Sequence, residues 1–71
     1  MRKFVNVTES IFTPVEPRRA GILGEECLVA VRFVESRSET TGWIYEYEVT
    51  GEVGKVEKFF VRIKDIERKR G

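Results

Sequence analysis

The fold of this chain is decided by residues 43–63, which read WIYEYEVTGEVGKVEKFFVRI. Apolar and polar side chains alternate on both sides of a short loop at residues 51–53. Alternation with a period of two indicates strands with one buried face, and glycine beside a short loop between two such runs is typical of a β-hairpin. The segment therefore predicts two antiparallel strands, over residues 43–49 and 55–63.

The side chains of this predicted hairpin also indicate its register. A pairing centred on residue 52 places Tyr45 opposite Phe59 on one face and Glu46 opposite Lys58 on the other. Aromatic pairs and opposite charges are favourable cross-strand neighbours. A slip of one residue would move every side chain to the other face, so we expect this register.

The remaining apolar runs predict three more strands, over residues 3–12, 26–35 and 67–70. The second of these is apolar on both faces, which predicts a central strand. The third belongs to the basic C-terminal end, residues 67–71, and a frayed tail is its alternative. Two prolines and two glycines interrupt residues 13–26, which therefore predict a long loop, and the polar residues 36–42 predict a connector.

This order of elements predicts an all-β fold, a small five-stranded barrel. It resembles the SH3-like barrels in general plan, and the spacing of the elements carries that resemblance over most of the chain. An OB-like barrel and an open antiparallel sheet are the alternatives. A chain of 71 residues has room for a single small domain, which we place over residues 1–71.

The composition limits the setting of the protein. The 13 Lys and Arg residues nearly balance the 12 Asp and Glu residues, and charged residues make up 35% of the chain, against about 25% in typical domains. With Asn6 as its sole side-chain amide, this composition predicts a thermophilic source. No apolar run approaches the ~18 residues of a membrane span, and a lone cysteine fits a reducing compartment, so we expect a cytoplasmic protein.

The residues that usually perform catalysis are scarce. The chain has no histidine to act as a base near neutral pH. Its one thiol, Cys27, lies in an apolar run and is expected to be a buried small hydrophobe. The two glycines of GILG, residues 21–24, are too close together for a phosphate-binding or dinucleotide-binding loop. We therefore expect no enzyme activity, no cofactor and no metal site.

A nucleic-acid site is the first functional hypothesis. In the predicted strand, Lys58, Phe60 and Arg62 alternate along one face, and Lys64 follows. Unpaired bases of RNA or DNA stack on exposed aromatic rings beside Lys and Arg. The alternative is that Phe60 is covered and that Lys58 pairs with Glu46. The net charge of +1 argues against the hypothesis, because nucleic-acid-binding domains usually carry a basic excess.

A protein interface is the second hypothesis. Ile44, Val56 and Phe60 form an apolar stripe on the predicted hairpin face opposite Tyr45 and Phe59. A contiguous exposed apolar patch marks an interaction site, and an isologous homodimer would cover it most simply. The alternative is that Ile22, Leu23 or Phe12 covers the stripe and completes a closed barrel. We thus expect a non-catalytic binding module, for nucleic acid or alternatively for protein interaction or homo-oligomerisation.

Overall fold

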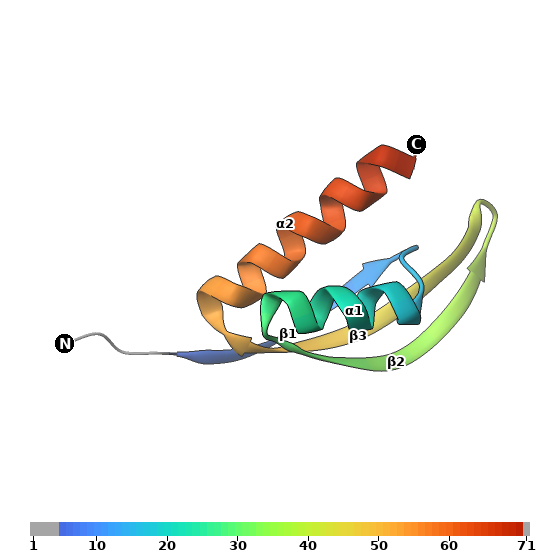
Figure 1. The fold of residues 1–71 in the computed structure, drawn as a ribbon. Helices are drawn as coiled ribbons and strands as arrows, with labels where there is room; N and C mark the ends of the chain where they lie inside the picture. Colours follow the sequence, from blue (N-terminus) through green and yellow to red (C-terminus); the bar gives the residue numbers. More distant parts are fainter. Residues whose placement is uncertain (1–4, 71) are drawn as a thin grey trace.

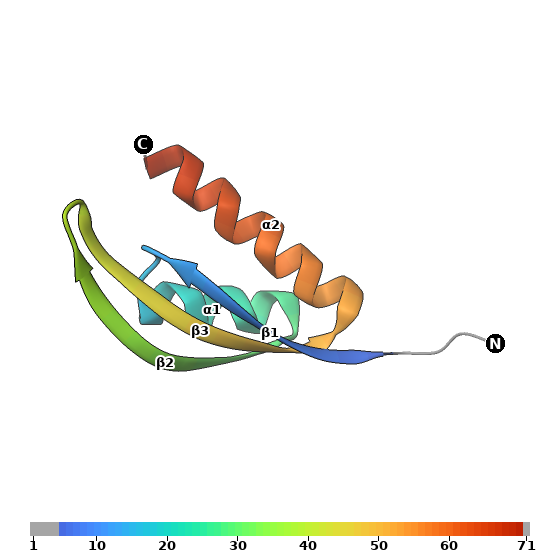
Figure 2. The same ribbon diagram turned by 180° about the vertical axis from the view of Figure 1, so that it is seen from behind.

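The computed structural model describes residues 5–70 and shows a three-stranded antiparallel sheet with two helices. In chain order the elements are β1 (Asn6–Thr13), α1 (Pro17–Cys27), β2 (Ala30–Glu39), β3 (Gly42–Glu52) and α2 (Val53–Arg70). Both helices lie on the same side of the sheet (Figure 1), as the view from behind also shows (Figure 2). The prediction of an all-β, five-stranded SH3-like barrel is therefore wrong, because the sheet is open and helices cover one of its faces.

The sheet has the order β1-β3-β2, so β3 is the central strand. β1 pairs with β3 from Asn6↔Glu52 to Thr13↔Tyr45. The hairpin of this fold joins β2 to β3, and its tight turn follows the pair Glu39↔Gly42. The prediction of a strand over residues 43–49 is confirmed. The second strand is an edge strand rather than the central one, and most of the predicted connector, residues 36–42, belongs to the hairpin.

α2 replaces the predicted strand over residues 55–63. Its apolar side chains Val56, Phe59 and Ile63 are spaced by three and four residues, the spacing that gathers one face of a helix. All three are at most 1% exposed. Glu, Lys and Arg, which are good helix formers, occupy most of the remaining positions. The helix continues to Arg70, so the prediction of a short strand or a frayed tail over residues 67–70 is also wrong. Gly71 and residues 3–4 of the first predicted strand lie outside the described residues.

α1 occupies most of the predicted long loop. Pro17 stands at the start of the helix, where its missing N–H costs nothing and its fixed φ suits the first turn. Ala20, Leu23 and Cys27 then form a buried face. The helix ends at Cys27, and the capping residue Leu28 takes the left-handed conformation with φ 61°. The proline and the glycines of this segment thus start and pack a helix instead of forming a loop.

The hydrophobic core lies between the helices and the inner face of the sheet. Tyr47 and Val49 of β3 are at most 1% exposed and pack against the buried faces of both helices. The Tyr47 hydroxyl donates a hydrogen bond of 2.7 Å to the Val15 carbonyl. The Thr13 hydroxyl donates to a Glu67 carboxylate oxygen and accepts the Val15 N–H. These bonds fasten the β1–α1 connection and the last turns of α2 to the sheet.

The outer face of the sheet carries polar side chains and no helix. The Arg32 guanidinium donates two hydrogen bonds to Oε1 of Glu48, at 3.1 and 2.7 Å. The hydroxyls of Thr8 and Thr50 are 2.9 Å apart. Of the residues that the structure describes, no helix combines the length and the apolar character that crossing a membrane requires.

Candidate nucleic-acid interface

The fold separates charges that nearly cancel in the sequence. α1 and α2 together contain nine Lys or Arg and five Asp or Glu residues, a net charge of +4. The three strands contain two Arg and six Glu residues, a net charge of −4. A chain with a net charge of +1 therefore presents a basic helical layer and an acidic sheet. The small net charge is thus no argument against a polyanion as the partner.

The basic side chains of α2 gather on the flank that faces α1. Each residue of an α-helix advances by about 100°, so the four cations of this flank fall within an arc of about 60°: Lys55, Lys58, Arg62 and Lys69. They extend over about 21 Å of helix at ~1.5 Å per residue. Arg19 of α1 lines the same interhelical groove as Arg62 and Lys69. We refer to these five residues as the basic stripe.

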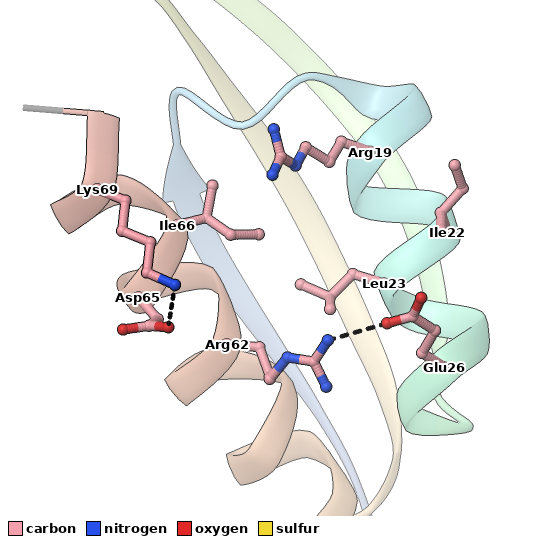
Figure 3. A pocket seen from close by; sticks show the side chains of 8 residues that line it. All are labelled: Arg19, Ile22, Leu23, Glu26, Arg62, Asp65, Ile66 and Lys69. Atoms are coloured by element: carbon pink, nitrogen blue, oxygen red, sulfur yellow. Dashed lines mark hydrogen bonds and ion pairs between the residues drawn. The ribbon is translucent and has the colours of Figure 1, made fainter.

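A groove of about 280 Å³ lies between the two helices, and Arg19, Arg62 and Lys69 of the basic stripe line it. Figure 3 shows the side chains that line it: Arg19, Ile22, Leu23, Glu26, Arg62, Asp65, Ile66 and Lys69. Arg62 spans the groove and donates to Oε1 of Glu26 at 2.9 Å. Lys69 lies 3.6 Å from Oδ2 of Asp65 on its own helix. The groove is therefore lined by apolar side chains, three cations and two carboxylates, and each carboxylate is in an ion pair with one of the cations.

The other cations of the stripe are unpaired. Within residues 5–70, the side chains of Arg19, Lys55 and Lys58 are exposed and form no ion pair. The side chains of Arg18 and Lys64, outside the stripe, are also exposed and form no ion pair. The carboxylates left without an ion pair or hydrogen bond on the same two helices are those of Glu25 and Glu57. The helical layer thus has a surplus of cations that no carboxylate of the described chain neutralises.

The four residues predicted as a nucleic-acid site do not lie together. Lys58 and Arg62 are one turn apart and both belong to the basic stripe. Phe60 and Lys64 lie on the other flank of α2, because two residues turn a helix by about 200°. Phe60 is half-buried, and its ring centroid is 6.1 Å from that of Phe59. The basic strand with a central aromatic ring is therefore not formed, and one of its three cations, Lys64, lies apart from the other two.

The three residues predicted as a protein interface are also separated. Ile44 is on the outer face of β3, since its neighbour Tyr45 faces inward, and it pairs with Arg37 of β2. Val56 is in the core with an exposed fraction of 1%, and Phe60 lies on a flank of α2. The predicted stripe required a strand over residues 55–63, and the helix found there places these side chains in different layers.

A row of aromatic side chains on the hairpin is the second feature of this surface. Phe33 of β2 and Tyr45 of β3 have ring centroids 6.4 Å apart, and Tyr47 is within 6.3 Å of both. Trp43 extends the row toward the turn and is 55% exposed. The alternation of residues 43, 45 and 47 predicted their common face, whereas Phe33 was missed because β2 was not paired with β3.

A hollow of about 320 Å³ lies beside the end of this row. Its lining comes from the hairpin turn and from the β1–α1 connection: Pro14, Glu16, Thr41, Gly42, Trp43 and Tyr45. Burial raises the pKa of the Tyr47 phenol well above its usual range, with smaller contributions from Tyr45 and Glu16. Tyr47 therefore stays protonated, and its role is to hold the β1–α1 connection in place.

The described residues show no site for a metal ion. Among residues 5–70, no group of three or more His, Cys, Asp or Glu side chains could hold one, and Cys27 is buried in the core. Comparisons of the chain with protein-family models, with curated proteins and with solved structures each found no match. The proposals below rest on the geometry and charge of this chain.

Proposed function

We propose that this protein is a non-catalytic module that binds nucleic acid, RNA or DNA, along the basic stripe. The observation that carries the proposal is the row of Lys55, Lys58, Arg62 and Lys69 on one flank of α2, with Arg19 facing it. Lys and Arg side chains bind a nucleic acid mainly by neutralising its phosphates and releasing counterions. Three of these five cations are unpaired within the described chain and are available to phosphate.

The acidic sheet supports binding by the helical side alone. Five glutamates of the strands lie on the outer face with two arginines, both of which are in ion pairs with glutamates. Like-charge contact between this face and a polyanion is unfavourable, and complementary potentials orient the two partners. The nucleic acid is therefore expected to approach the helices and to leave the outer face of the sheet in solvent.

Anisotropy titrations with labelled single-stranded RNA and duplex DNA test this function. Affinity is expected to fall steeply between about 50 and 200 mM salt, as for any complex held by phosphate contacts. Lys58→Glu reverses one charge of the stripe and is expected to weaken binding, since it puts a carboxylate where a phosphate would lie.

Lys64→Glu is the matched control. It makes the same change of charge on the same helix, six residues along and away from the stripe, so a smaller loss is expected. Absence of binding at low salt would refute the proposal, as would equal losses for the two variants. The mass in solution, measured in parallel, reports the alternative role in homo-oligomerisation.

A further inference from the structure

Trp43, the exposed residue at the turn end of the aromatic row, lies at one end of the basic stripe. Arg19 is in the first turn of α1 and Lys69 is in the last turn of α2. The N-terminal end of α1, the C-terminal end of α2 and the turn of the hairpin all lie at the same end of the molecule (Figures 1 and 2). A strand that follows the stripe from Lys55 to Lys69 is therefore led toward Trp43.

We propose that the nucleic acid is single-stranded and that one of its bases stacks on Trp43 at the hollow under the hairpin. This inference rests on the proposed function. Aromatic rings beside cations hold unpaired bases with little regard to sequence. In a duplex both faces of each base are already covered by neighbouring bases, so a base can reach an indole ring only when it is unpaired or flipped out.

The chemistry of the hollow suits a base better than a phosphate. Trp43, Tyr45 and Pro14 supply apolar and aromatic surface, and the carboxylate of Glu16 is the charged group among its lining residues. A carboxylate repels phosphate, whereas it accepts hydrogen bonds from the exocyclic amino groups of cytosine, adenine and guanine. Phosphates and bases therefore have different places on this protein: the stripe for the first, the hollow for the second.

Trp43 is the single tryptophan of the chain, so its fluorescence reports the stacking directly. Titration of the full chain with a short oligocytidine strand is expected to quench this fluorescence, and a duplex of the same length is expected to leave it nearly unchanged. Trp43→Ala, followed with a labelled strand, is expected to weaken binding about 5- to 150-fold, the equivalent of about 1–3 kcal/mol for one stacked base. Trp43→Phe retains an aromatic ring and is expected to keep most of the affinity.

Val61→Ala is the matched control. Val61 is also an exposed apolar side chain, 67% exposed on α2, but it lies outside the hollow and the groove. This variant is expected to bind the strand as the unmodified protein does. Circular dichroism of each variant shows whether it is folded. If Trp43→Ala does not fold, the affinity of Trp43→Phe is compared with that of the unmodified protein instead.

The possible outcomes separate this inference from the proposed function. Salt-dependent binding with unchanged Trp43 fluorescence, and with full affinity in Trp43→Ala, would overturn the inference and leave the function intact. Absence of binding by any strand or duplex would overturn both. Quenching by a proline-rich peptide but by no oligonucleotide would assign the hollow to a protein ligand instead, since aromatic grooves also bind such peptides.

Discussion

Alanine substitution of the two glycines of α1 tests how this helix packs on the sheet. A Cβ atom built on Gly24 would lie 2.5 Å from Cγ2 of Val31 and 3.3 Å from the carbonyl oxygen of Val29. A Cβ atom on Gly21 would meet no atom within 4 Å. The two positions are one turn apart on the same helix, so the substitution removes glycine from a helix in both cases and creates a clash in one.

The two substitutions are expected to have different effects on stability. Gly21→Ala is expected to stabilise the protein by about 1 kcal/mol, the difference in helix propensity between alanine and glycine. Gly24→Ala gains the same amount, but overpacking against a stiff valine and the backbone costs about 1–3 kcal/mol. The difference in the free energy of unfolding between the two variants is therefore about 1–3 kcal/mol. For a domain of this size, each kcal/mol corresponds to about 4–8 °C in Tm.

Thermal and urea unfolding followed by circular dichroism measure this difference, with the unmodified protein as reference. The expected order of stability is Gly21→Ala first and Gly24→Ala last. If Gly24→Ala were as stable as Gly21→Ala, the close approach of α1 to β2 would be refuted. If both variants were destabilised, a loop with unusual glycine conformations over this segment would explain the result better than a helix.

Three further predictions concern the core and the groove. Tyr47→Phe removes the buried hydrogen bond to the backbone of the β1–α1 connection, which is expected to lower the free energy of urea unfolding by about 1–3 kcal/mol because the carbonyl acceptor is left unsatisfied. Phe59→Ala empties a fully buried position and is expected to cost about 3–5 kcal/mol, whereas Phe12→Ala, at an exposed position, is expected to cost less than about 1 kcal/mol in the same assay. Glu26→Gln breaks an exposed ion pair with Arg62 that is worth at most about 1 kcal/mol, so the stability of the protein should change little. The affinity for nucleic acid should rise, because Arg62 is then free to contact phosphate. An unchanged affinity would show that Arg62 is not part of the interface.

The sequence predicted β3 correctly but predicted a strand over residues 55–63, where α2 lies, and particular residues show the physical reason. The alternation over residues 43–49 is unambiguous, because a sheet with one covered face imposes a period of two. Within residues 55–63, the apolar residues are spaced ambiguously. Residues 56 and 60, and residues 59 and 63, are four apart, as on one face of a helix, whereas residues 59, 61 and 63 alternate as in a strand. Burial of Val56 and Phe59 against β3 decides between the two, and this tertiary contact cannot be read from the local pattern.

The helix found in place of the predicted strand also explains why the predicted site residues are separated. Strand geometry groups Lys58, Phe60 and Arg62 on one face, whereas helix geometry keeps Lys58 beside Arg62 and turns Phe60 away. Arg19 was not predicted because proline and glycine indicated a loop; Pro17 at the start of a helix was the signal that could have corrected this. The alternation over residues 43–49 placed Trp43 on the same face as Tyr45 and Tyr47, but it could not show that Trp43 is 55% exposed while Tyr47 is buried.

The salt dependence of binding tests the central claim most directly. For single strands, the logarithm of the binding constant falls with the logarithm of salt concentration by about 0.7 for each phosphate neutralised. Three to five cations of the basic stripe therefore predict a slope of about −2 to −3.5. Lys58→Glu should reduce the steepness by about 0.7, and Lys64→Glu should leave the slope unchanged. A slope near zero, or the same reduction in both variants, would contradict binding of nucleic acid along this stripe.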